Sequence, residues 1–147
     1  MSRAAIVATI VTSTFAFSSF SLAASDEEIS HSGDKMSATF KCLTYARMFH
    51  DYKEKQRLFE IGLKAARNFY EGVKNHSDTG EIGEFIRKTS TDFMAGISYD
   101  SETTKARDEI VKYQNGMLRE PSKWLDPSAA KTEAERSYRN GNCSLIQ

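Results

Sequence analysis

Residues 58–73 read LFEIGLKAARNFYEGV and carry the clearest helical pattern in the chain. One row of side chains recurs at steps of three and four residues, and it consists of Leu58, Gly62, Ala65, Phe69 and Val73. A second row, one position further on, widens the first into a broad apolar stripe, while charged residues occupy the opposite face. Small residues between large aromatic ones allow another helix to approach closely here. The stretch therefore predicts the central helix of an all-helical core.

Similar rows predict further helices on both sides of this one. We expect helices over residues 34–50, 52–74, 81–89, 92–118 and 127–140. Asp51 with Glu54, and Asp126 with Pro127, have the form of helix starts. The segment 92–118 is one long helix or two, because its polar run at Asp100 favours a break.

These helices predict an all-α fold, a compact bundle of about four to five helices forming a single domain over residues 34–147. In the short helix 81–89 we expect Ile82, Phe85 and Ile86 to face inward, and Trp124 and Leu125 to cover the core. The side chains expected at the helix contacts of the core are Phe40, Phe59, Gly62, Ala65, Phe69, Phe93, Gly96, Tyr99, Ala106 and Ile110.

Residues 1–24 have the design of a cleaved export signal. Arg3 supplies a positive end, a mostly apolar run follows to Phe17, and Ser21-Leu22-Ala23 offers the small residues that a signal peptidase reads. Serine and threonine weaken this run below the roughly 20 strongly apolar residues of a transmembrane helix. We therefore expect cleavage, a periplasmic or secreted location, and a disordered leader over the polar residues 25–33.

Cys42 and Cys143 are the two cysteines of the chain. An even count in a small exported domain is typical of a structural disulfide. Two free thiols or a redox-active pair fit less well, because the chain has no Cys-x-x-Cys spacing and only Lys41 stands beside Cys42 to favour a thiolate. We expect a Cys42–Cys143 disulfide that joins the first helix to the C-terminal residues.

The charges of the chain are balanced, with 20 basic and 20 acidic residues. Removal of Arg3 with the signal leaves a slight acidic excess. Binding to nucleic acid or to an anionic membrane needs a concentrated basic patch. We therefore expect no nucleic-acid partner and no stable membrane insertion after cleavage, whereas the sequence leaves the oligomeric state open.

Few residues in the chain suggest catalysis. The three histidines, His31, His50 and His76, do not have the spacing of a zinc site, and no nucleophile or phosphate-loop motif is present. The acidic group within residues 100–109 fits a solvated helix face. We expect no catalytic residue, no metal ligand and no cofactor, although a carboxylate pair for glycoside cleavage stays an alternative.

Several motifs between residues 41 and 110 resemble a known group of proteins. They are Cys42 with Tyr45-Ala46, the spacing Phe59-x-x-Gly62, Phe69, and the run DFMAGISYDSETTKARDEI over residues 92–110. With them the chain resembles small exported helical proteins of proteobacteria and their phages. The resemblance implies export, helices and a disulfide, and it implies no activity.

Two functional hypotheses follow from these features. The first is an exported module that binds another envelope protein, such as an inhibitor or an immunity or exclusion factor. The second is a carrier of a small apolar ligand between helices, with Gly62, Gly72 and Gly96 leaving space in the core. A cell-wall-degrading enzyme is a third and weaker reading.

Overall fold

The computed structural model describes residues 24–76, 81–117 and 126–147. The regular structure of these residues is entirely helical, in agreement with the predicted all-α class. The helices are α1 (Asp26–Met48), α2 (Tyr52–His76), α3 (Glu81–Lys88), α4 (Thr91–Met117), α5 (Pro127–Asn140) and the short 3₁₀ helix η1 (Cys143–Leu145). None of the described helices combines the length and the apolar composition that crossing a bilayer requires. Most of the expected signal peptide, and Trp124 and Leu125, lie outside the described residues.

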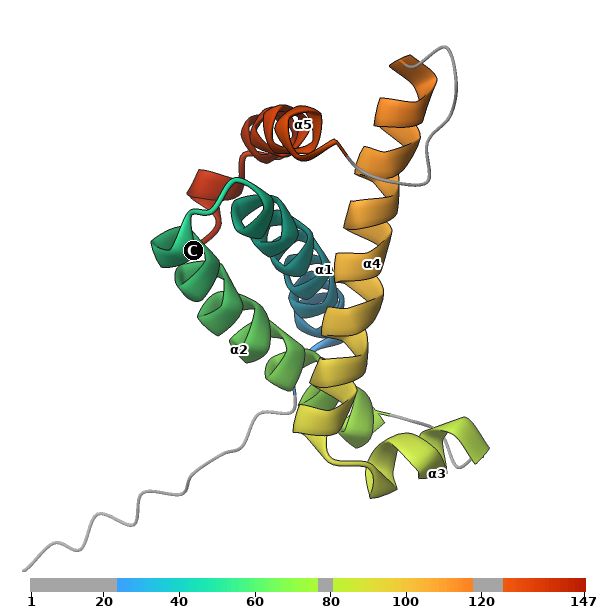
Figure 1. Ribbon diagram of the computed structural model, residues 1–147. Coiled ribbons are helices and arrows are strands. Elements are labelled where there is room, and N and C mark those ends of the chain that lie inside the picture. The colour runs from blue at the N-terminus through green and yellow to red at the C-terminus, as the bar shows by residue number, and fades with distance from the viewer. Residues whose placement is uncertain (1–23, 77–80, 118–125) are drawn as a thin grey trace, which may run out of the picture.

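The helices are arranged around an antiparallel pair formed by α1 and α2 (Figure 1). The long helix α4 crosses this pair on one side, and α5 lies over one end of α1 and α4. The short helix α3 lies at the other end, beside the start of α4. Buried residues form two clusters, one where α1, α4 and α5 meet and one where α1, α2 and α4 meet.

A tight turn joins α1 to α2 at the predicted position. His50 adopts a left-handed conformation with φ of 65°, which ends α1. The backbone N–H of Glu54 donates a hydrogen bond of 3.0 Å to the Asp51 carboxylate, so Asp51 caps α2. The predicted helix break before Tyr52 is confirmed.

Glycine on α2 lets α1 approach closely, as the sequence predicts. A Cβ at Gly62 would lie 2.5 Å from the Phe40 ring of α1. A Cβ at Gly72 would lie 2.5 Å from the Ile29 side chain, one end of the same helix pair. The Phe40 ring and the Ile29 side chain therefore occupy the space that the two glycines leave.

The prediction of a disordered leader over residues 25–33 is wrong, because α1 begins at Asp26. Ser25 and Glu28 form a capping box, in which the Glu28 carboxylate accepts a hydrogen bond of 2.8 Å from the Ser25 backbone N–H. Ile29 is buried against Gly72, and Gly33 packs against the Phe69 ring. Tertiary contact therefore orders a segment whose composition alone favours disorder.

The segment after Ser90 is one helix rather than two. The Ser90 hydroxyl accepts a hydrogen bond from the backbone N–H of Phe93 at 3.1 Å and so caps α4. The helix continues through Asp100 and Ser101 to Met117. Packing of Ala95, Ala106 and Ile110 against the other helices supports it on both sides of the polar run.

The C-terminal helix is held as the sequence predicts. The Asp126 carboxylate accepts a hydrogen bond of 2.8 Å from the Ala129 backbone N–H, and Pro127 occupies the first helical position. After Asn140 the chain turns and brings Cys143 to Cys42, where the two sulfur atoms are bonded and both residues are buried. The predicted disulfide thus joins α1 to the C-terminal residues.

The helix α3 differs from its prediction at Phe85. Phe85, expected to face inward, is 56% exposed. Among the other described helices α3 packs only on α2, and Ile86 is half-buried.

Candidate functional site

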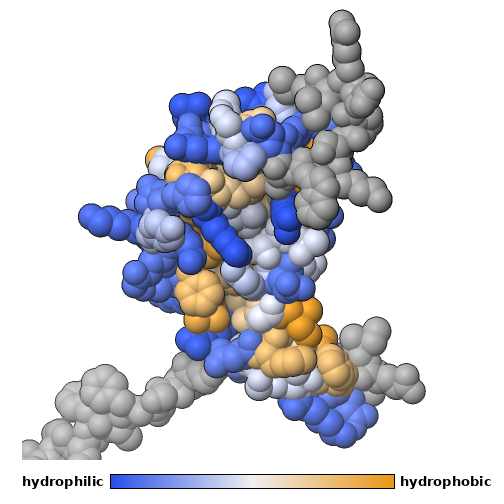
Figure 2. All heavy atoms as spheres, in the orientation of Figure 1, coloured by the Kyte–Doolittle hydropathy of each residue, from blue (hydrophilic) through white to orange (hydrophobic). Residues whose placement is uncertain are grey.

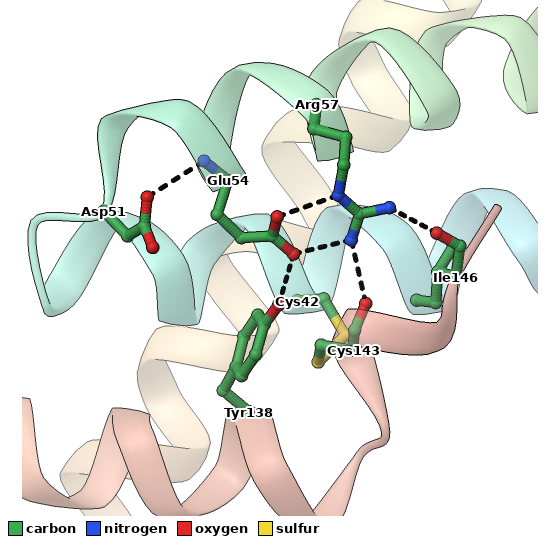
Figure 3. A network of polar contacts seen from close by, with 7 residues as sticks. All are labelled: Cys42, Asp51, Glu54, Arg57, Tyr138, Cys143 and Ile146. Atoms are coloured by element: carbon green, nitrogen blue, oxygen red, sulfur yellow. Dashed lines mark hydrogen bonds and ion pairs between the residues drawn. A yellow bond between two sulfur atoms is a disulfide. The ribbon is translucent and has the colours of Figure 1, made fainter.

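A network of polar side chains joins α2 to the C-terminal segment (Figure 3). The Arg57 guanidinium donates to the Glu54 carboxylate at 2.8 and 2.5 Å, and to the backbone oxygens of Cys143 and Ile146. The Tyr138 hydroxyl donates to the same carboxylate. We call Glu54, Arg57 and Tyr138 the C-terminal clamp, because together they fasten α5 and the last residues to α2.

The pKa values of two side chains in the C-terminal clamp are shifted by their contacts. Hydrogen bonds from Arg57 lower the pKa of Glu54, against the opposing effect of its partial burial. Burial, and after it the Glu54 carboxylate, raises the pKa of Tyr138 to about 12. Near neutral pH the carboxylate is therefore ionised and the phenol protonated, so neither group is prepared to exchange a proton there.

The acidic residues of α4 serve two different roles. The Glu102 carboxylate accepts hydrogen bonds from the Ser37 hydroxyl at 2.8 Å and the Lys105 ammonium at 2.7 Å, and it is largely shielded from solvent. Glu109 pairs with Lys41 of α1 at 2.7 Å. These two carboxylates fasten α4 to α1, whereas the remaining acidic residues of the group are exposed, as expected for a solvated face.

The histidines do not converge on a site. His31, His50 and His76 are all exposed, and they stand at separate places in the fold. In the described part of the chain, no group of three His, Cys, Asp or Glu residues is close enough together to hold a metal ion.

A surface depression on α4 is lined by apolar side chains. Phe93 is 59% exposed and Ile97 is 48% exposed, and they lie one turn apart with Gly96 between them. Together with Asp92, Asp100 and Ser101 they line a shallow, open depression of about 530 Å³. We call this depression the apolar groove. In Figure 2, hydrophobic surface gathers over the end of the molecule where α4 begins and α3 lies.

The apolar groove is on the outside of a well-packed helix. On the opposite side of α4, Ala95, Ala106 and Ile110 are buried. Tyr99 packs edge-on against two rings, that of Phe40 at 5.4 Å and that of Phe59 at 6.1 Å between ring centroids. The helix that carries Phe93 and Ile97 is therefore firmly seated, although these two side chains are not.

A second depression lies between the end of α1 and the middle of α4. It encloses about 500 Å³. Its lining residues are Thr44, Arg47, Met48, His50, Asp100, Thr103, Thr104 and Arg107. We call it the arginine groove. Asp100 belongs to both depressions, so the two grooves are neighbours along α4.

The prediction of core residues is confirmed at Phe40, Gly62, Ala65, Ala106 and Ile110, which are all buried. Phe69 and Tyr99 are partly buried and pack against the same core.

Phe59 is more exposed than predicted, although its ring still packs against Tyr99. The prediction is wrong at Phe93 and Gly96, which are exposed. An α-helix turns about 100° per residue, so Phe93 points about 140° away from the buried Ala106. A row of steps of three and four drifts around the helix over this length, so its members do not all face the core. Phe93 and Gly96 lie at the outer edge of that row, and a Cβ at Gly96 would have no atom within 4 Å.

Ile97 is the residue of the apolar groove that the sequence prediction leaves out. It follows Phe93 by four residues, which places both side chains on one face of the helix. Asp100, Thr104 and Arg107 continue this face. A short apolar pair at the end of an otherwise polar helix face is the sequence signal that indicates an exposed patch.

Comparison of the chain with protein-family models, curated proteins and solved structures finds no match. The resemblance to small exported helical proteins of proteobacteria and phages stays a prediction.

Proposed function

We propose that the protein is a binding module of the cell envelope that docks another protein through the apolar groove. The partner presents a large apolar side chain to Phe93, Gly96 and Ile97. An inhibitory or immunity-type role belongs to this class of function. The predicted export signal and the Cys42–Cys143 disulfide support an oxidising compartment outside the cytoplasm.

The observation that carries the proposal is the exposure of Phe93 and Ile97 on a firmly seated helix. Exposed apolar residues that lie together, with polar residues around them, are typical of protein–protein contact sites. Aromatic side chains on a rigid backbone lose little conformational freedom on binding, which favours their use as anchors. The acidic rim, Asp92 and Asp100, provides the polar border of such a contact.

The structure does not favour the carrier of a small apolar ligand. The space at Gly62 and Gly72 is filled by Phe40 and Ile29, and Gly96 lies on the surface. The apolar groove itself is lined by residues of α4 alone, whereas a ligand carrier buries most of the ligand between elements. Nothing in the described residues favours a wall-degrading enzyme. Glu102 and Glu109 form contacts between α4 and α1.

Site-specific crosslinking tests the proposal. A photoreactive side chain replaces Ile97 in the full-length protein, expressed in its own host, and in a control it replaces Leu145, an apolar residue that is even more exposed. We expect a discrete adduct with a second protein from position 97 and none from position 145. Phe93→Ser should remove the adduct, while the melting temperature changes little because Phe93 is outside the core.

Two outcomes would contradict the proposal. One is an adduct of twice the mass of the protein, which would identify a second copy as the occupant of the groove. The other is an adduct that survives Phe93→Ser, or labelling no stronger at position 97 than at position 145.

A further inference from the structure

The arginine groove contains two guanidinium groups that face solvent. Arg47 comes from the last turn of α1 and Arg107 from the fifth turn of α4, and both are exposed. Within the described part of the chain neither guanidinium forms an ion pair. By contrast, Arg57, Arg67 and Arg136 each bind a carboxylate within 2.7 Å.

The local charge of the arginine groove is positive. Asp100 is its single acidic lining residue, and its carboxylate is more than an ion-pair distance from both guanidiniums. Arg47 lies in the last turn of α1, where the helix dipole stabilises a positive charge. Arg107 is in the interior of α4, so no helix end explains its charge. Two arginines against one aspartate leave the groove able to accept an anionic group.

The position of the arginine groove relates it to the apolar groove. Ile97, Asp100, Thr104 and Arg107 follow one another at steps of three and four along the outer face of α4. Ten residues separate Ile97 from Arg107, which is about 15 Å along a helix at 1.5 Å per residue. A single protein segment can therefore reach both grooves.

We infer that the arginine groove binds a carboxylate of the same partner protein, about 15 Å from the apolar side chain that enters the apolar groove. This inference rests on the proposed function. Guanidinium groups bind carboxylates through paired hydrogen bonds, which add direction to the attraction. The partner's recognition element is thus an apolar anchor followed or preceded at this distance by Asp or Glu.

A carboxylate fits this surface better than a nucleic-acid phosphate. Binding to a phosphate backbone requires a row of many basic residues. Here two arginines border an apolar depression and an aspartate, and the chain as a whole has as many acidic as basic residues. The mixed surface matches a protein segment with one apolar and one acidic contact.

Designed helical peptides test the inference without knowledge of the partner. Each peptide carries a Leu-Phe anchor and, ten residues before or after it, a Glu, a Gln or a Lys. Binding to the full-length protein is measured by fluorescence anisotropy. We expect the Glu peptide to bind roughly tenfold more tightly than the Lys peptide, the difference that one charge-assisted contact supplies.

Charge reversal provides the matched comparison. In Arg47→Glu/Arg107→Glu the preference should change from the Glu peptide to the Lys peptide. Lys112→Glu, an exposed cation of the same helix outside both grooves, should keep the preference for the Glu peptide. Far-ultraviolet circular dichroism of each variant confirms that the helices are retained.

The outcomes separate this inference from the proposed function. Equal binding of the Glu and Lys peptides, abolished by Phe93→Ser, would overturn the carboxylate site and leave the apolar groove supported. Binding that ignores Phe93→Ser, or no binding of any peptide, would overturn both. Tighter binding of an oligonucleotide than of the Glu peptide would overturn the carboxylate assignment in favour of a phosphate.

Discussion

Gly62 and Gly96 both lie within helices, but their surroundings are opposite. Gly62 lies where α2 meets the Phe40 ring, which is fully buried and held edge-on by Tyr99. Gly96 lies on the outer face of α4 with no atom within 4 Å of a Cβ placed there. Helix propensity is the same for both, so the difference between them comes from tertiary contact alone.

Replacement of each glycine by alanine should therefore have opposite effects. We expect Gly62→Ala to lower the free energy of unfolding by ~1–3 kcal/mol, because the Phe40 ring has no room to move. Gly96→Ala should raise it by ~0.5–1 kcal/mol, because alanine restricts the unfolded chain. Urea unfolding of the two variants checks this. A neutral Gly62→Ala would show that α1 and α2 do not cross as closely as described.

The Glu54 carboxylate makes the free energy of unfolding depend on pH in the acidic range. Its pKa is lowered in the folded protein from the ordinary 4.5, chiefly by hydrogen bonds from Arg57. A lowered pKa stabilises the fold above pH 4.5, and this contribution is lost as the pH falls through the folded value. We expect unfolding free energies measured from pH 7 to pH 3 to fall less steeply in Glu54→Gln than in the wild type. Some dependence should remain, because the pKa of Glu102 is also lowered: burial raises it, but the hydrogen bonds from Lys105 and Ser37 and the charges of Lys105 and Lys41 lower it further. Parallel curves for the two proteins would contradict this assignment.

At the scale of elements, α1 shows how a partner helix extends a neighbour. Its first two turns, DEEISHSG, contain Ile29 as the one large apolar residue and have little reason to fold alone. Ile29 and Gly33 nevertheless pack against α2, and Ser25 caps the helix start. The added turns lengthen the α1–α2 contact beyond the predicted start at residue 34.

Two isoleucines provide a direct test of this extension. Ile29→Ala should lower the free energy of unfolding by ~2–3 kcal/mol, since it leaves a cavity beside Gly72. Ile97→Ala removes the same atoms from the surface and should cost less than ~0.5 kcal/mol. Amide hydrogen exchange should show protection of residues 30–36 in the wild type and its loss in Ile29→Ala. Equal effects of the two substitutions would return residues 25–33 to the predicted disordered leader.

At the scale of the whole molecule, the Cys42–Cys143 disulfide closes a loop across a sequence separation of 101 residues. The C-terminal clamp and the edge-on contact of Phe49 with Tyr138 hold the same region. The disulfide therefore adds a covalent link to a region that α5 and the Arg57 hydrogen bonds also hold.

Removal of the disulfide should destabilise the protein without removing its helices. We expect Cys42→Ala/Cys143→Ala to lose up to ~4.7 kcal/mol, the value that loop entropy gives for a loop of this size. Hydrogen exchange should increase first in α5, while α1 and α2 stay protected by their own contact. Protein taken from the periplasm should react with a thiol reagent only after reduction. Two thiols that react without reductant would contradict both the disulfide and the expected export.

The elements of this fold were largely predictable from the sequence, because local signals specify where helices begin and end. Asp51 and Asp126 mark the starts of α2 and α5, and the step of three and four marks their apolar faces. Cysteine count and the small residue at position 62 predicted the disulfide and the close crossing. The helix caps and apolar faces depend on residues close together in the chain. The disulfide needs cysteine, and the close helix crossing needs a very small residue.

The tertiary structure alone decided which apolar residues are covered. Phe93 and Ala106 belong to one sequence row, yet the first is exposed and the second buried, because α1 and α2 cover only part of α4. Ile29 in a polar segment is buried for the converse reason. The apolar groove and the arginine groove depend on where α4 crosses α1, and no local pattern contains that position. Burial is a property of two elements that meet, whereas a sequence pattern describes one element at a time.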